Sequence, residues 1–316
     1  MDKKLYYDDI ALVPKYSTAT SRSNLNVATK LGNRSIALPI IPANMKCVID
    51  EKIAHFLSEN DYFYIMHRFD MNNINFVIKA NEQKWKMVSI SVGVKDSDRR
   101  DLIAMKAMKL SIDFITIDIA HGHSENMKKM LEFVRSVYPE ATIIAGNICT
   151  AYAYLDLVNW GADIVKVGVG PGAACTTKLK TGFTYPMFSC VMEIDDYRQK
   201  NDLNAPIIAD GGIVHNGDIA KALVAGADFV MCGKLFSECV DSPAPLINNQ
   251  KLYYGSASAQ NKQHKCNIEG KLVHLDHNGM TYREKLEEIK QDLQSAVSYS
   301  GSESISQLYM TDWVRI

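Results

Sequence analysis

The chain alternates short apolar segments with amphipathic stretches, and this alternation limits the possible folds more than any other feature of the sequence. Segments that are apolar on both faces are typical of parallel strands covered on both sides. Their alternation with helical patterns indicates βαβ units. Eight strands are predicted: Ile36–Ile41, Tyr62–Met66, Met87–Val92, Phe114–Asp118, Thr142–Ala145, Ile164–Val167, Ile207–Ala209 and Phe229–Cys232.

Helical patterns fill several of the gaps between these strands. The clearest predicted helices are Asp50–Glu59, Asp98–Lys109, Glu125–Tyr138, Ala151–Trp160 and Asp218–Ala225. Thr150 and Asn216 are expected to cap two of them. The tripeptide Gly-Ala-Asp stands twice between a helix and a strand, at 161–163 and 226–228. Its glycine suits the left-handed backbone that follows many helices.

We therefore predict an α/β fold, a (β/α)8 TIM barrel that forms a single domain over residues 1–316. The length would also suit two domains. An open doubly wound sheet is the alternative, but no GxGxxG motif opens a helix after the first strand. The polar stretch 242–278 has no predicted element and is expected to form an active-site flap. Tyr282–Tyr299, apolar along one face, is expected to form a C-terminal closing helix.

Charge and cysteine content exclude several classes of protein. The formal net charge is −1 and there is no basic block, so we expect neither nucleic acid nor a membrane surface as partner. No apolar run approaches the roughly 18 residues of a spanning helix, and the N-terminus lacks the apolar core of a signal peptide. Seven scattered cysteines form no CxxC pair and no zinc-ligand spacing, which favours reduced thiols in the cytoplasm.

Functional residues of a barrel stand at the carboxyl ends of its strands. The sixth predicted strand runs into the glycine-rich loop 168–177, whose backbone can approach a ligand or an ion closely. Cys175 lies in this loop and is a candidate nucleophile, provided that it becomes a thiolate. A buried structural cysteine is the alternative.

Two further strand ends suit a phosphorylated ligand. The seventh strand leads into Asp210-Gly211-Gly212, where a carboxylate can accept from ribose hydroxyls and the glycines leave backbone N–H groups open to phosphate. The eighth leads into Gly233-Lys234, and the loops after strands seven and eight of a barrel often bind phosphate. Ordinary tight turns are the alternative.

Other polar residues at these positions are weaker candidates. Asp118 ends the fourth strand as a possible acceptor, whereas the His-x-His at 121–123 lacks a third ligand for a metal. Lys166 is expected to pair with a carboxylate inside the barrel, and a Schiff-base lysine is the alternative. Glu269 in the flap could orient Thr177 or relay a proton, and a solvated loop carboxylate is the alternative.

Six motifs, in the same order, resemble the IMP dehydrogenase/GMP reductase family over essentially the whole chain. They are PANM at 42–45, DIAHG at 118–122, AGN at 145–147, GVGPGAACTTK at 168–178, IADGG at 208–212 and YGS at 254–256. Within the family the chain is most similar to short bacterial reductases. Residues 66–87 leave no room for the regulatory insertion that dehydrogenases usually carry. Residues 242–278 lack the Arg-Tyr pair of a dehydrogenase flap and contain Glu269-Gly270-Lys271 instead.

The resemblance implies the reaction GMP + NADPH → IMP + NADP⁺ + ammonia. Cys175 would attack C2 of the purine and form a thioimidate, and Thr177 with Glu269 would protonate the departing amine. A dehydrogenase without its regulatory insertion, or a purine-nucleotide-binding barrel without activity, are the alternatives.

The resemblance also implies the binding residues. Substrate would be held by Asp210, Gly211, Gly212, Gly233, Ser256 and Ala257. NADPH would be held by Asn44, Asp118, Gly168 and Arg68, with Asp118 and Gly168 at the nicotinamide end and Arg68 at the 2′-phosphate. A monovalent cation such as K⁺ would bind the backbone carbonyls of Gly170, Gly172 and Cys175, and the assembly would be a homotetramer. Three residues depart from the family pattern near these sites: Ala173, Lys234 and Cys266.

Overall fold

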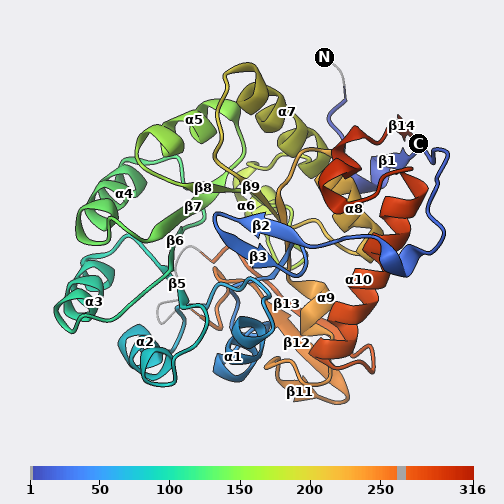
Figure 1. Ribbon diagram of the computed structural model, residues 1–316. Coiled ribbons are helices and arrows are strands. Elements are labelled where there is room, and N and C mark those ends of the chain that lie inside the picture. Colours follow the sequence, from blue (N-terminus) through green and yellow to red (C-terminus); the bar gives the residue numbers. More distant parts are fainter. Residues whose placement is uncertain (1–2, 262–267) are drawn as a thin grey trace.

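The computed structural model describes residues 3–261 and 268–316 and contains a curled parallel sheet with helices around its outside (Figure 1). The seven strands of this central sheet follow the order β4-β10-β9-β8-β7-β6-β5. Their bounds are β4 (Ile40–Pro42), β5 (Ser89–Val92), β6 (Phe114–Asp118), β7 (Thr142–Ile148), β8 (Ile164–Val167), β9 (Ile207–Asp210) and β10 (Phe229–Cys232). The predicted α/β class with a parallel sheet is confirmed.

Two of the eight predicted strands differ from the structure. Tyr62–Met66 forms no strand; it is joined to β5 by a single bridge between Met66 and Ile90. The side chains of Phe63 to Met66 are buried, which explains the apolar pattern, but burial does not require a continuous hydrogen-bond ladder. The predicted strand Ile36–Ile41 is interrupted before Pro39, which has no N–H to donate; β3 ends at Ile36 and β4 begins at Ile40.

The helices lie mainly outside the sheet, as Figure 1 shows. Their bounds are α1 (Glu51–Glu59), α2 (Asn73–Glu82), α3 (Asp96–Ala107), α4 (Glu125–Val137), α5 (Ala151–Asn159), α6 (Thr177–Thr181), α7 (Met187–Lys200), α8 (Asn216–Val224), α9 (Lys234–Ser237) and α10 (Tyr282–Tyr299). The five helices predicted between strands are present as α1, α3, α4, α5 and α8, and α2, α6, α7 and α9 are additional. Thr150 caps α5 as predicted, but the cap of α8 is His215 and not Asn216. Among the described residues, no helix is long and apolar enough to cross a membrane.

The Gly-Ala-Asp repeat joins neighbouring strands where they begin, at what we call the amino edge of the sheet. Its glycines have φ of 105° and 107°, in the left-handed range. Asp163 accepts the N–H of Ile143 on the neighbouring strand at 2.7 Å and an Arg135 nitrogen at 2.6 Å. Asp228 repeats the pattern with the first residue of β9 and with Arg198 at 2.5 Å. The repeat therefore fixes strand spacing as well as helix ends.

The predicted flap stretch 242–278 contains secondary structure, contrary to expectation. Three antiparallel strands form there: β11 (Leu246–Ile247), β12 (Gln250–Tyr254) and β13 (Leu272–Asp276). The last two are far apart in sequence, so no local hairpin signal predicts their pairing. The predicted helix Tyr282–Tyr299 matches α10, which packs against α8.

Two small antiparallel pairs complete the sheets. Strands β2 (Thr29–Leu31) and β3 (Arg34–Ile36) form a hairpin, seen in front of the centre of the ring of helices in Figure 1. Strands β1 (Ile10–Leu12) and β14 (Trp313–Arg315) pair with each other and so bring distant parts of the chain together. Short 3₁₀ helices cover Tyr7–Asp9, Arg22–Asn24 and Ile305–Met310.

Candidate active site

A thiol, a hydroxyl and a carboxylate form one hydrogen-bonded chain after β8. The Cys175 Sγ donates to Thr177 Oγ1 at 3.2 Å, and Thr177 Oγ1 donates to Glu269 Oε2 at 2.5 Å. All three side chains are partly buried. The structure thus brings together the three residues predicted as catalytic, although Glu269 is far from the other two in sequence.

Backbone hydrogen bonds hold the Glu269 segment against the cysteine loop. The Thr176 N–H donates to the Glu269 carbonyl at 2.7 Å, and the Glu269 N–H donates to the Ala257 carbonyl at 3.0 Å. On the far side of Glu269, the Lys271 N–H donates to the Ala174 carbonyl at 2.9 Å. The carboxylate is therefore positioned by main-chain contacts on both sides.

The next residue, Gly270, packs tightly against the flap. A Cβ at this position would lie 2.9 Å from the Ser258 nitrogen, closer than a side chain can normally come. Gly270 also forms an isolated antiparallel bridge with Cys175. The predicted residues Ser256 and Ala257 lie in the turn just before this contact. Cys266 lies outside the described residues.

The glycines predicted to face a phosphate bring loops from different strands into close contact. Gly211 and Gly212 follow β9 with φ of 96° and 81°. A Cβ on Gly211 would lie 2.9 Å from Cγ of Pro171 in the cysteine loop. A Cβ on Gly233 would collide with the buried hydroxyl of Tyr253 on β12. Side chains at these positions would push the strand ends apart.

Lys166 lies in the middle of the carboxyl edge, where the strands end, and its side chain is 3% exposed. Its ammonium lies 2.9 Å from Asp118 Oδ1 and 2.6 Å from Asp210 Oδ2. Burial alone would lower the pKa of Lys166, but the two carboxylates outweigh it and raise that pKa above its ordinary value. A Schiff-base lysine must be neutral to attack a carbonyl, so the predicted carboxylate pairing is confirmed and the alternative is disfavoured.

Asp118 is held from three sides. Besides Lys166, the Asn44 amide donates to Asp118 Oδ2 at 3.0 Å, and an Arg68 nitrogen donates to the Asp118 carbonyl at 3.2 Å. Burial would raise the pKa of Asp118, but Lys166, Arg68 and Asn44 together hold it below its ordinary value. Three of the four residues predicted to hold the cofactor therefore lie together.

Asn147 is a residue of this region whose contacts the sequence did not predict. Its amide donates to Asp210 Oδ2 at 2.8 Å and to the carbonyl of Gly168, the fourth predicted cofactor residue, at 2.7 Å. The signal was available, because Asn147 stands near the carboxyl end of β7, where polar residues are usually functional. Gly168 has a φ of 142°, and a Cβ there would collide with the Asp210 carbonyl.

The five other described cysteines are buried, except for Cys149, which like Cys175 is partly buried. Burial raises the pKa of Cys47 to about 11 and that of Cys239 to about 12. Burial likewise raises the pKa of Cys149, Cys190 and Cys232. Because only a thiolate is strongly nucleophilic, these five thiols are poorly suited to react.

Several other predicted positions have definite neighbours. The Gly172 carbonyl accepts the Cys175 N–H at 2.9 Å, and Gly170 has a φ of 84°. Lys234 lies at the start of α9, and its ammonium is 3.6 Å from Glu238, along the helix. His123 pairs with Asp156 at 2.8 Å. Across the described part of the chain, no group of three or more His, Cys, Asp or Glu side chains could hold a metal ion.

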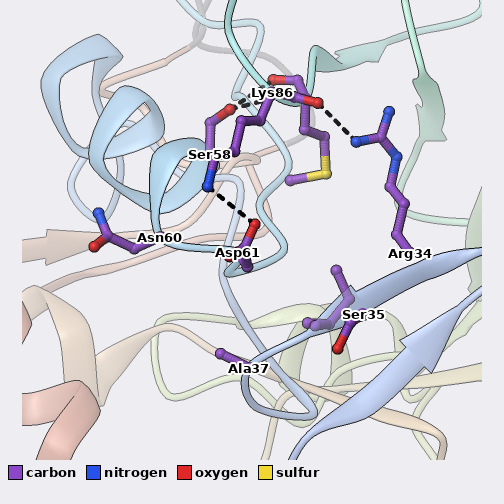
Figure 2. Close-up of a pocket in the computed structure, with 9 residues that line it drawn as sticks. Arg34, Ser35, Ala37, Ser58, Asn60, Asp61 and Lys86 are labelled. Carbon is purple, nitrogen blue, oxygen red and sulfur yellow. Dashed lines mark hydrogen bonds and ion pairs between the residues drawn. The ribbon is translucent and has the colours of Figure 1, made fainter.

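A cavity of about 630 Å³ lies away from all these residues, at the amino edge (Figure 2). It is lined by Arg34, Ser35, Ile36, Ala37, Ser58, Asn60, Asp61, Lys86 and Met87. Figure 2 shows Arg34 directed at the Lys86 backbone, 2.7 Å away, and the Lys86 ammonium directed at Asp61, 3.3 Å away. Since these polar groups bind one another, we place the candidate active site at the carboxyl edge and not in this cavity.

Comparison with known proteins identifies the family of the chain. A family model described as the IMP dehydrogenase / GMP reductase domain matches residues 4–315. A GMP reductase of Leptothrix cholodnii is 43% identical over 314 residues, which are 98% of this chain and 94% of the relative. GMP reductases of Lactobacillus acidophilus and Oceanobacillus iheyensis are each 42% identical; they cover 98% and 99% of this chain, and 93% and 96% of their own lengths are matched. The chain belongs to the IMP dehydrogenase/GMP reductase family.

Proposed function

We propose that this protein is a GMP reductase, which converts GMP to IMP with NADPH and releases ammonia. The observation that carries the proposal is the hydrogen-bonded chain from Cys175 through Thr177 to Glu269. Relatives that bear the name GMP reductase match nearly the whole chain, which supports the same conclusion.

Covalent catalysis divides a difficult displacement into two easier steps. The Cys175 thiol transfers its proton along the chain to Glu269 by way of Thr177, and the sulfur attacks C2 of the purine. Glu269 then returns a proton through Thr177 to the 2-amino group, so that the C2–N bond breaks and ammonia leaves. The purine remains bound to Cys175 as a thioimidate. In the second half of the reaction C2 accepts a hydride and the C–S bond breaks, which releases IMP and leaves the Cys175 thiolate. One proton from solvent then restores the thiol.

The substrate is held by the loops that follow β9 and β10. Asp210 accepts from the ribose hydroxyls, and the backbone N–H groups of Gly211, Gly212 and Gly233 bind the 5′-phosphate. Within the described residues, Asn147 and Lys166 bind Oδ2 of Asp210, so Oδ1 is the oxygen proposed to accept from the ribose. The Asp210 side chain is 21% exposed. Ser256 and Ala257 contribute the flap side of the site.

Asn44, Asp118, Gly168 and Arg68 hold NADPH, which when bound supplies the hydride. The residues fit such a ligand, because the Arg68 Nε is buried and has no hydrogen-bond partner among the described residues. Arg68 contacts the backbone of Asp118, whereas the nicotinamide and the 2′-phosphate stand at opposite ends of an extended NADPH. We therefore propose that Arg68 binds the nicotinamide half, in place of the 2′-phosphate expected from the sequence.

The remaining expectations complete the proposal. The curled sheet, with the segment Tyr62–Met66 as its eighth member, forms a single-domain (β/α)8 barrel with a flap over residues 242–278 and α10 as its closing helix. The carbonyls of Gly170, Gly172 and Cys175 bind K⁺, since uncharged oxygens suit such a cation. The protein acts in the cytoplasm as a homotetramer.

The test is NADPH consumption by the purified protein with GMP, IMP and XMP measured in parallel. We expect oxidation of NADPH and release of ammonia with GMP. For Cys175→Ala we expect the rate to fall by about 10³-fold or by a larger factor. Reduction of NAD⁺ with IMP would favour a dehydrogenase. Tight GMP binding without turnover would favour a binding protein.

A further inference from the structure

Four neighbouring strands of the central sheet are connected at their carboxyl edge through Lys166. Asp118 ends β6, Asn147 lies near the end of β7, Lys166 lies on β8 and Asp210 ends β9. The ammonium binds both carboxylates, and the Asn147 amide binds Asp210 from a second direction. Lys166 therefore connects two carboxylates whose strands, β6 and β9, are not neighbours in the sheet.

This arrangement differs from an ordinary buried ion pair. One cation serves two acids, so its loss would leave two carboxylates close together with no positive charge between them. Asp118 is also near Arg68, but that guanidinium donates to the Asp118 carbonyl and is not between the acids. Only two residues further along the chain, Gly168 begins the loop that bears Cys175.

We infer that Lys166 is a positioning residue that fixes the relative positions of Asp118 and Asp210, and hence of the nicotinamide and ribose subsites that they border. This inference rests on the proposed function. It assigns Lys166 no contact with substrate or cofactor. Its loss should weaken the binding of both ligands together, because both carboxylates would move.

A matched control exists at the amino edge. Arg198 also bridges two acids, Asp195 at 2.6 Å and Asp228 at 2.5 Å, and its side chain is 15% exposed. Arg198 lies at the opposite end of the strands from the cysteine loop. Arg198→Met therefore removes a bridging cation of the same kind, but from a place where it cannot align the two subsites.

The experiment compares Lys166→Met, Lys166→Arg and Arg198→Met with the wild type. Circular dichroism checks folding, steady-state kinetics gives KM for GMP and for NADPH, and calorimetry gives the Kd of each ligand. We expect Lys166→Met to raise both KM and both Kd values about tenfold or more. Lys166→Arg keeps the charge in a wider, forked group and should raise them about threefold. Arg198→Met should leave them within about twofold of wild type.

KM and Kd values for Lys166→Met that match those of Arg198→Met would overturn the inference. If Lys166→Met does not fold, Lys166→Arg decides: unchanged ligand affinities would then assign Lys166 to stability alone. Failure of the proposed function is a separate outcome, since it would be seen as a wild-type protein that does not oxidise NADPH with GMP. An active wild type with insensitive Lys166 variants would contradict only the positioning role.

Discussion

The two edges of the central sheet carry the same kinds of side chain and use them differently. At the amino edge, Asp163 and Asp228 each bind one arginine and a backbone N–H of the neighbouring strand. At the carboxyl edge, Asp118 and Asp210 share one buried lysine beside the loop that bears Cys175. The amino-edge carboxylates bind main-chain groups, whereas the carboxyl-edge ones lie among side chains and glycine loops.

The comparison shows that the presence of an aspartate at a strand end does not by itself reveal whether its role is structural or functional. What matters is whether its partners belong to the sheet's own backbone, which fixes strand spacing, or to groups that border a ligand site. In α/β barrels the amino edge is generally used for stability and the carboxyl edge for chemistry. Variants at the two edges should therefore separate activity from stability.

The largest expected effect is on catalysis. Glu269→Gln keeps the shape of the side chain but cannot take up the proton that Thr177 passes on, so kcat should fall about 10²- to 10⁴-fold. The unfolding midpoint in urea should stay unchanged, because Glu269 is not fully buried. Glu140→Gln is the matched control, because it makes the same change from carboxylate to carboxamide at an exposed residue of the amino edge. It should leave kcat unaltered. Equal rates for both variants would remove Glu269 from the mechanism.

Lys166→Met should cause the largest loss of stability. Removing one partner of a buried ion pair leaves uncompensated charge and costs about 3–5 kcal/mol. Urea unfolding at neutral pH measures this loss of stability. We expect it in addition to the weaker binding of GMP and NADPH by the same variant. A free energy of unfolding within about 1 kcal/mol of wild type would mean that the two carboxylates find other partners.

His67 offers a pH-dependent comparison at the carboxyl edge. Burial, helped by Lys46, lowers the pKa of His67 to about 4, and its Nδ1 accepts the Phe69 N–H at 3.2 Å. In the unfolded chain the His67 imidazole takes up a proton below its ordinary pKa of 6.5, whereas in the folded protein it does so only near pH 4. Stability should therefore fall by about 3 kcal/mol between these two pH values.

The check on His67 is urea unfolding of wild type and His67→Gln from pH 7 to pH 4. The difference in unfolding free energy between the two proteins should shrink as the pH falls, because the variant has no imidazole to protonate. A difference that is independent of pH would show that the folded protein binds the proton as readily as the unfolded chain.

The smallest effect is expected at the amino edge. Arg198→Met should lower the free energy of unfolding by about 2 kcal/mol, less than Lys166→Met, because Asp228 is 37% exposed and stays partly hydrated. Its kcat per folded molecule should equal that of wild type. A fall in kcat of tenfold or more would show that the two edges are coupled and would weaken the distinction drawn above.

Side-chain patterns in the sequence predict most of the sheet because burial on both faces leaves a clear apolar signature. They do not reveal backbone pairing: Tyr64 is fully buried, yet its segment makes only one bridge to the sheet. The helix α7 was missed because its early residues are buried nearly all round, so they show little 3.6-residue contrast. The pairing of β12 with β13 was missed because it is not local, whereas β12 pairs with β11 across a short turn at Asn248 and Asn249 that was not predicted from the sequence.

The candidate site could be predicted only in part from the residues themselves. The glycine-rich loop and the polar strand ends located the carboxyl edge. The contact between Thr177 and Glu269 was implied by family resemblance, since no spacing rule connects residues that far apart. The bridging of two acids by Lys166 needed the structure, because it depends on which strands lie side by side.

The pairing of β1 with β14 has a consequence for how the chain is made. The Val13 N–H also binds the Asp312 carbonyl, so the segment after β1 depends on the same distant partner. Ribosomes add about 5–20 residues per second, so β1 is synthesised on the order of 15 to 60 s before its partner. During that interval its apolar residues, Ile10 among them, have no finished strand to pair with. A segment made early in synthesis thus completes its pairing late.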